Sequence, residues 1–115
     1  MIVEMRTYVL QPGQQVPFLR LMEQEGILIE RRILGRMLGF YSTEFGVQNQ
    51  VVHLWGYDSF EERQRRRSLL AASAEWLAFV PKVMPMIRDM QNQLLNPAPF
   101  AAIETLDWQG PNLAS

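Results

Sequence analysis

The sequence contains no cysteine, and this absence excludes a disulfide framework and any thiolate chemistry. Histidine is almost absent too, since His53 is the only one in 115 residues. One histidine cannot build a metal site alone, and pairing it with Glu4 or Glu44 matches no known ligand spacing. The sequence also lacks a glycine-rich phosphate loop, a nucleophile elbow and an HExxH motif. We therefore expect no metal and no cofactor.

Neither sign of charge dominates the chain, because 11 basic and 12 acidic residues give a formal net charge of −1. No global field then favours nucleic acid or an anionic membrane, and no nucleic-acid motif is present. No apolar run approaches the roughly 18 residues that span a bilayer, and the sequence starts unlike a signal peptide. We expect a soluble, cytoplasmic protein with no nucleic-acid or membrane partner, since cysteine-free chains fit a reducing compartment.

Alternation and turn residues predict the element order strand, helix, strand, strand, helix, strand. The expected strands cover 2–9, 36–45, 50–57 and 87–95, and the expected helices cover 14–33 and 59–71. This order is that of an α+β, ferredoxin-like βαββαβ domain, with a four-stranded antiparallel sheet and both helices on one face. We expect the domain to span 1–100 and a C-terminal tail to span 101–115.

Several residues mark the ends and the packing of the helices. Ser59 and Glu62 have capping-box spacing, and Ser73 is placed to cap a further short helix that Pro81 and Pro85 kink or end. Gly26 lies on the apolar stripe of the first helix, which predicts a close approach of that helix to the sheet.

Four arginines cluster in the second helix, at positions 63, 65, 66 and 67. On a helix they spread around more than half of the circumference, and the acids at 61 and 62 offset part of their charge. This pattern favours a solvated helix face over a phosphate or nucleic-acid patch.

Strand alternation divides the sheet into two faces. We expect the plainly apolar sets, among them Val3 and Val52, to lie under the helices. The remaining face would be open and rich in aromatic side chains, so it needs a cover, which a second copy of the chain supplies most simply. A homodimer would then enclose a pocket for a small-molecule ligand, lined by Glu4, Arg6, Tyr8, His53, Trp55 and Tyr57.

Each of these residues also has a purely structural interpretation. Glu4 and Arg6 can pair with charges on neighbouring strands. A lone histidine in a strand is more often a hydrogen-bonded structural group than a catalyst, and Trp55 and Tyr57 are more often packing residues.

The chain resembles the NIPSNAP family over about residues 2–100. The similarity is carried by short segments in a fixed order: EMRTY over 4–8, QPG over 11–13, LGF over 38–40, TEFG over 43–46 and NQVVHLW over 49–55. Further matches are Glu62-Arg63 with Arg67, then Trp76 with Lys82 and Pro85, and Leu95-Asn-Pro97. The resemblance implies a dimeric α/β barrel of ferredoxin-like subunits but no established activity, and the wider superfamily includes cofactor-free monooxygenases.

Two functions compete on this evidence, and they leave open whether the protein is an enzyme. In the first, the protein binds a small molecule. The enzymatic form of this hypothesis is a cofactor-free monooxygenase, with His53 as general base or hydrogen-bond donor and Arg6 holding an anionic oxygen. In the second, it is a non-catalytic interaction module whose aromatic face only holds the homodimer together. Haem ligation by His53 is a weaker third idea.

Overall fold

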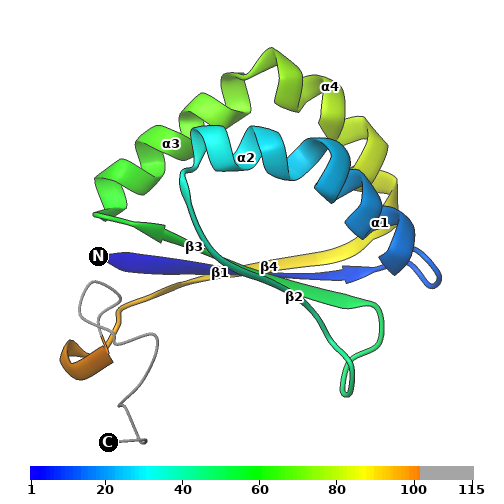
Figure 1. Cartoon of the computed structure of the whole chain (residues 1–115), viewed down its shortest axis with the longest axis horizontal. Helices are drawn as coiled ribbons and strands as arrows, with labels where there is room; N and C mark the ends of the chain where they lie inside the picture. Colours follow the sequence, from blue (N-terminus) through cyan, green and yellow to red (C-terminus); the bar gives the residue numbers. More distant parts are fainter. Residues whose placement is uncertain (102–115) are drawn as a thin grey trace, which may run out of the picture.

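The computed structural model describes residues 1–101 as a four-stranded sheet with its helices on one side (Figure 1). The strands are β1 (Ile2–Leu10), β2 (Arg36–Ser42), β3 (Gln50–Tyr57) and β4 (Ile87–Leu95). The helices are α1 (Gln15–Leu21), α2 (Ile27–Ile33), α3 (Phe60–Ala72) and α4 (Ala74–Val83). Three short segments complete the order: the π turn η1 (Met22–Gly26) and the 3-10 turns η2 (Met84–Met86) and η3 (Pro99–Ala101).

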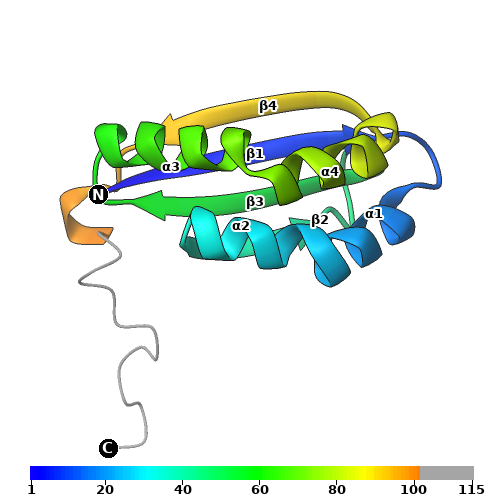
Figure 2. The same ribbon diagram turned by 90° about the horizontal axis from the view of Figure 1, so that it is seen from above.

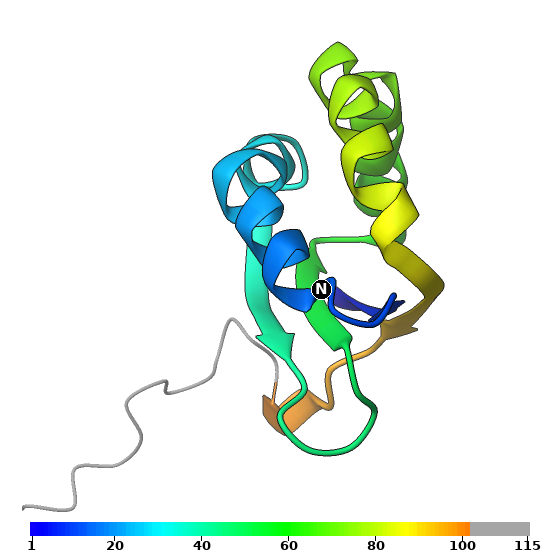
Figure 3. The same cartoon turned by 90° about the vertical axis from the view of Figure 1, so that its right-hand side faces the viewer.

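The sheet order is β2-β3-β1-β4, and every neighbouring pair is antiparallel (Figure 2). The two central strands, β1 and β3, pair over nearly their whole lengths, from Ile2 opposite Tyr57 to Val9 opposite Gln50. Helices α1 to α4 lie on the same side of this sheet (Figure 3). The α+β, ferredoxin-like fold expected from the element order is therefore confirmed.

Most predicted boundaries agree with the structure. The strands predicted over 50–57 and 87–95 have those bounds, and the first strand is one residue longer. The second strand ends at Ser42 rather than at residue 45, because the chain turns through Gly46 and Asn49, which both have positive φ angles. The first helix contains a π turn that periodicity did not indicate. Helix α4 continues through Pro81, and Pro85 lies in η2.

Both predicted serine caps are present. The Ser59 hydroxyl accepts a hydrogen bond from the Glu62 N–H at 3.1 Å, and the Ser73 hydroxyl accepts one from the Trp76 N–H at 3.3 Å. The prediction for Gly26 was wrong about the neighbour. A Cβ atom there would lie 2.7 Å from the Phe79 ring, so the glycine lets this helix approach α4 rather than the sheet.

The assignment of the two sheet faces was wrong. The set predicted to lie under the helices is on the open face, where Met5, Val52 and Leu54 are only partly buried and Val3 is 8% exposed. The set predicted to be open faces the helices, where Trp55, Tyr57 and Val51 join the hydrophobic core. Burial of these large side chains, with Phe18, Leu34 and Phe79 from the helical layer, decides the orientation.

No helix among residues 1–101 is long and apolar enough to cross a membrane. Apart from Ala101, the predicted tail lies outside the described residues, so the domain boundary at 100 stays a prediction.

Candidate functional site

The six predicted pocket residues come together, but inside the subunit rather than on its open face. Strand pairing places them in adjacent rows across the sheet, with Glu4 opposite Trp55, and Arg6 opposite His53. Tyr8 follows on β1 and Tyr57 ends β3. Glu4, His53, Trp55 and Tyr57 are all at most 2% exposed. The candidate site is therefore the layer between the sheet and the helices.

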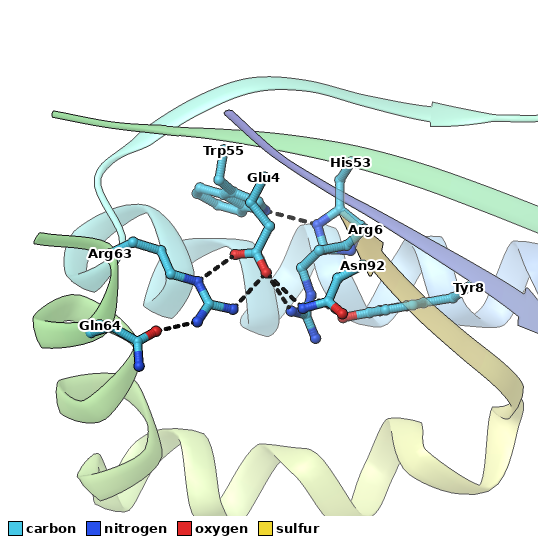
Figure 4. A network of polar contacts seen from close by, with 8 residues as sticks. All are labelled: Glu4, Arg6, Tyr8, His53, Trp55, Arg63, Gln64 and Asn92. Carbon is cyan, nitrogen blue, oxygen red and sulfur yellow. Dashed lines mark hydrogen bonds and ion pairs between the residues drawn. The ribbon is translucent and has the colours of Figure 1, made fainter. Parts of the chain in front are cut away.

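Glu4 is the centre of a buried polar network (Figure 4). Its carboxylate accepts hydrogen bonds from Arg63 of α3 at 2.7 and 3.3 Å, from Arg6 at 3.1 Å and from Asn92 of β4 at 2.9 Å. Burial alone raises the pKa of Glu4, but the hydrogen bonds from Arg63 and Asn92 and the charges of Arg6 and Arg63 outweigh it and lower the pKa to about 2. Glu4 is therefore ionised, and it ties three elements together.

Arg6 is anchored within the same layer by two neighbours. Besides Glu4, its Nε donates to the Tyr8 hydroxyl at 2.8 Å, and its guanidinium carbon lies 5.6 Å from the Tyr8 ring centroid. Burial lowers the pKa of Arg6, yet the nearby Tyr8 and Glu4 raise it overall. Burial also raises the pKa of the Tyr8 hydroxyl, which is therefore neutral. Both side chains are held in fixed positions.

His53 is held as a neutral hydrogen-bond donor. The Trp55 indole N–H donates to His53 Nδ1 at 2.8 Å, so Nδ1 carries no proton and the remaining hydrogen is on Nε2. Burial, with the charges of Arg6 and Arg67, lowers the pKa of His53 to about 3. Of the two predicted roles, this arrangement fits a hydrogen-bond donor and not a general base.

The surroundings of His53 also disagree with haem ligation. Its ring is stacked on Phe40 at 4.6 Å and meets Tyr8 edge-on at 4.9 Å, so aromatic side chains flank the imidazole on both sides. Within residues 1–101, no group of three or more His, Cys, Asp or Glu side chains is arranged to hold a metal ion.

Glu30 of α2 belongs to the same layer and was missed by sequence reasoning. It is 3% exposed, and burial raises the pKa of its carboxyl to about 7, although the charges of Arg67 and Arg6 act in the opposite direction. The sequence does contain a signal for this residue. Glu30 lies four residues after Gly26 and eight after Met22, which places it on the apolar side of the helix. A carboxyl on an apolar stripe marks a candidate site.

The arginine run has two faces, so the predicted solvated face is only half correct. Arg65 pairs with Glu62 at the surface, while the Arg63 side chain is 16% exposed and pairs inward with Glu4. Arg67, one turn after Arg63, acts through its charge on Glu30, His53 and Tyr57. Arg63 and Arg67 are four residues apart and therefore lie on one side of α3. The buried Leu70 continues this side of the helix.

Three buried polar atoms in this layer have no hydrogen-bond partner within residues 1–101: Glu30 Oε1, His53 Nε2 and the Tyr57 hydroxyl oxygen. Native interiors pair the large majority of such atoms with protein or ordered water. Burial also raises the pKa of Tyr57 to about 12, so its hydroxyl stays protonated. The layer thus offers two hydrogen-bond donors, on His53 and Tyr57, and the Glu30 carboxyl to a bound polar molecule.

Two hollows lie in this layer, and Glu30 lines the smaller one. An apolar hollow of about 280 Å³ is lined by Leu19, Met22, Glu23, Ile27, Met37 and Phe40. A smaller cavity of about 50 Å³ lies between Tyr8, Phe18, Met22, Glu30 and Trp76, with further apolar side chains from α4, η2 and β4. Met22 lines both, so the two hollows are neighbours.

The model of the NIPSNAP family matches residues 3–102. The chain belongs to the NIPSNAP family. Among curated NIPSNAP relatives, the Protein NipSnap homolog of Dictyostelium discoideum is 32% identical over 94 residues. NipSnap homolog 3A of Homo sapiens is 31% identical over 103 residues. These matches cover 82% and 88% of this chain but only 41% of each relative, so the chain spans less than half of their length.

Solved NIPSNAP structures agree with the fold. A NIPSNAP family protein from Agrobacterium tumefaciens is 38% identical with a TM-score of 0.87, covering 89% of this chain and 97% of its own. A NIPSNAP-like domain protein from Burkholderia xenovorans is 46% identical with a TM-score of 0.85, covering 87% of both chains. A structure described as an antibiotic biosynthesis monooxygenase is 14% identical with a TM-score of 0.61, covering 86% and 100%, and shares the fold alone.

Proposed function

We propose that this NIPSNAP domain binds a small molecule in the layer between its sheet and its helices. The observation that carries the proposal is the group of unpartnered buried atoms on Glu30, His53 and Tyr57, in the layer that also holds an apolar hollow of about 280 Å³. The His53 ring stacks on Phe40, which lines this hollow. Binding sites for small molecules combine such apolar walls with a few placed polar groups, and this volume is near the lower end of their usual range. Among enzyme classes, the monooxygenase-type chemistry named for the fold neighbour is the first to test.

We also propose that the functional unit is a homodimer formed through the open sheet face. On this face β1 and β3 present Val3, Met5, Val52 and Leu54 and no charged side chain. The β2–β3 loop bends toward the same side (Figure 1), and its Phe45 is 91% exposed. The uncharged centre of this face can be complementary to itself across a two-fold axis, while β4 adds Gln93, Gln91 and Asp89 along one edge.

Native mass spectrometry of gently purified protein tests both parts together. We expect a mass of twice the chain plus a reproducible additional species. The Ile27→Trp variant should lose that species and keep the dimer, because its larger side chain fills the apolar hollow. Leu28→Trp is the matched control, since Leu28 is 60% exposed on the outer side of the same helix. An additional species that persists in Ile27→Trp would place the ligand elsewhere.

The alternative function, a non-catalytic interaction module, is favoured by one observation. Phe45 and Phe100 are 91% and 90% exposed, which is unusual for aromatic side chains outside an interface. On this alternative, the purified protein would be a dimer with no additional species, and Ile27→Trp would leave its binding to partners unchanged.

A further inference from the structure

Of the two buried carboxyls within residues 1–101, Glu30 is the one with an oxygen that no hydrogen bond reaches. Glu4 accepts hydrogen bonds from three side chains, whereas Glu30 Oε1 has no partner within residues 1–101. The side chain is 3% exposed and lines the cavity of about 50 Å³ together with Tyr8. Leaving a buried acceptor unpaired is unfavourable, so a ligand that donates a hydrogen bond there would be bound more tightly.

The charges around Glu30 fit a step in which a negative charge moves from the protein to the guest. Arg67 from α3 and Arg6 from β1 both act on the carboxyl, and both lower its pKa. Burial is the larger effect and raises that pKa to about 7. A carboxyl that titrates near neutrality both exists as the carboxylate and holds a proton once it has accepted one.

Met22 is the side chain that the two hollows near this carboxyl have in common. Met22 borders the apolar hollow of about 280 Å³ and the smaller cavity that contains Glu30. Its unbranched thioether side chain has several rotatable bonds, so it can move aside without rearranging the backbone. Met22 also begins the π turn η1, and such turns occur frequently at functional sites.

Resting on the proposed function, we propose that Glu30 is the proton acceptor of the interior site. Its ligand is an apolar molecule that becomes an oxyanion on losing one proton, such as an enolisable ketone or a phenol. The apolar body occupies the hollow beside Met22, and the acidic proton points to Glu30 Oε1.

The step balances without any further reagent. The C–H or O–H bond of the ligand breaks, an O–H bond forms at Glu30, and the electron pair stays on the ligand as enolate or phenolate. The net charge of the site is unchanged, because the ligand gains the negative charge that Glu30 loses. Arg67 and Arg6 then stabilise the new oxyanion, and the return of the proton restores the starting state.

Hydrogen–deuterium exchange of 2-tetralone, an apolar enolisable ketone, tests this proposal. In D₂O near neutral pH, the wild type should accelerate deuterium incorporation next to the carbonyl by at least about tenfold over buffer. Glu30→Gln keeps the size of the side chain but cannot accept the proton, so exchange should fall to the buffer rate. Glu44→Gln, the same change at an exposed position of the β2–β3 loop, should exchange like the wild type.

Saturation-transfer NMR in the same samples separates binding from proton transfer. Binding of 2-tetralone to wild type and Glu30→Gln alike, with exchange lost only in Glu30→Gln, supports the proposal. Equal exchange in both proteins overturns the role of Glu30, while binding itself would leave the proposed function standing. No binding to the wild type overturns the ligand class, and the additional mass expected in native spectra then decides the proposed function separately.

Discussion

At the residue scale, burial shifts two ionisable groups of the interior in opposite directions. The pKa of His53 falls from 6.5 to about 3, so the folded protein holds this imidazole neutral and loses stability as the pH drops through that window. The pKa of Glu30 rises from 4.5 to about 7, so the folded protein holds an extra proton and loses stability as the pH increases through that window. Between pH 4.5 and 6.5 the two effects oppose each other.

Replacing Glu30 by glutamine should remove one of these effects. Relative to the wild type, we expect the free energy of unfolding of Glu30→Gln to increase between pH 4.5 and pH 7. The increase is at most about 3 kcal/mol, because each pKa unit corresponds to about 1.4 kcal/mol. Urea unfolding at both pH values, with Glu44→Gln as control, measures it. A difference from the wild type that does not change with pH would contradict the raised pKa.

The sequence predicted which strand residues form the site but not how they are bonded. Alternation placed Glu4, Arg6 and His53 on one face correctly. The Trp55–His53 hydrogen bond, which fixes the tautomer, depends on side-chain torsions that no sequence pattern reports. Glu30 was not predicted because helix periodicity identifies the apolar residues of a buried stripe. A carboxyl on such a stripe is an exception to that pattern.

At the element scale, α3 connects the surface to the interior. The Arg63 guanidinium reaches across 59 positions in sequence to the fully buried Glu4, whereas Arg65 and Arg66 pair with Glu62 on the same helix. Surface pairs of this local kind contribute little, but breaking a buried pair leaves a charge without compensation.

Arginine-to-methionine variants at two positions of α3 distinguish the buried ion pair from the surface ion pairs. Arg63→Met should lower the free energy of unfolding by roughly 3 kcal/mol, because Glu4 then keeps only Arg6 and Asn92 as partners. Arg65→Met should leave it nearly unchanged, since Arg65 pairs at the surface. Urea denaturation at neutral pH compares the two variants. Similar losses for both would mean that the Glu4 network adds little to stability.

The buried ion pair between Arg63 and Glu4 explains why the two sheet faces were assigned the wrong way round. Charged residues at positions 4 and 6 made their face look solvent-exposed, and alternation alone does not say which face the helices cover. Arg63 of α3, together with Arg6 of β1, compensates the charge of the buried Glu4, and Trp55 and Tyr57 then enter the core. The volume of these aromatic side chains was the better guide.

At the scale of the whole molecule, no helix of the described chain covers the open sheet face. The proposed homodimer predicts that Leu54→Lys, in the middle of this face, yields a monomer in sedimentation experiments, because two lysines would meet across the two-fold axis. Leu28→Lys, on the outer side of α2, should remain a dimer. A dimeric Leu54→Lys protein would show that the copies meet elsewhere.

The strand order has a consequence for the time course of folding. The central strand β1 has β4 as one of its two neighbours, and the Glu4–Asn92 hydrogen bond joins positions 88 residues apart. During synthesis β1 can pair with β3 first, but one of its edges stays unpaired until β4 leaves the ribosome. At a synthesis rate of about 5–20 residues per second, that edge stays unpaired for several seconds, during which strands of other chains can pair with it. Closure of the sheet, and completion of the Glu4 network with it, is therefore a late and non-local event in folding.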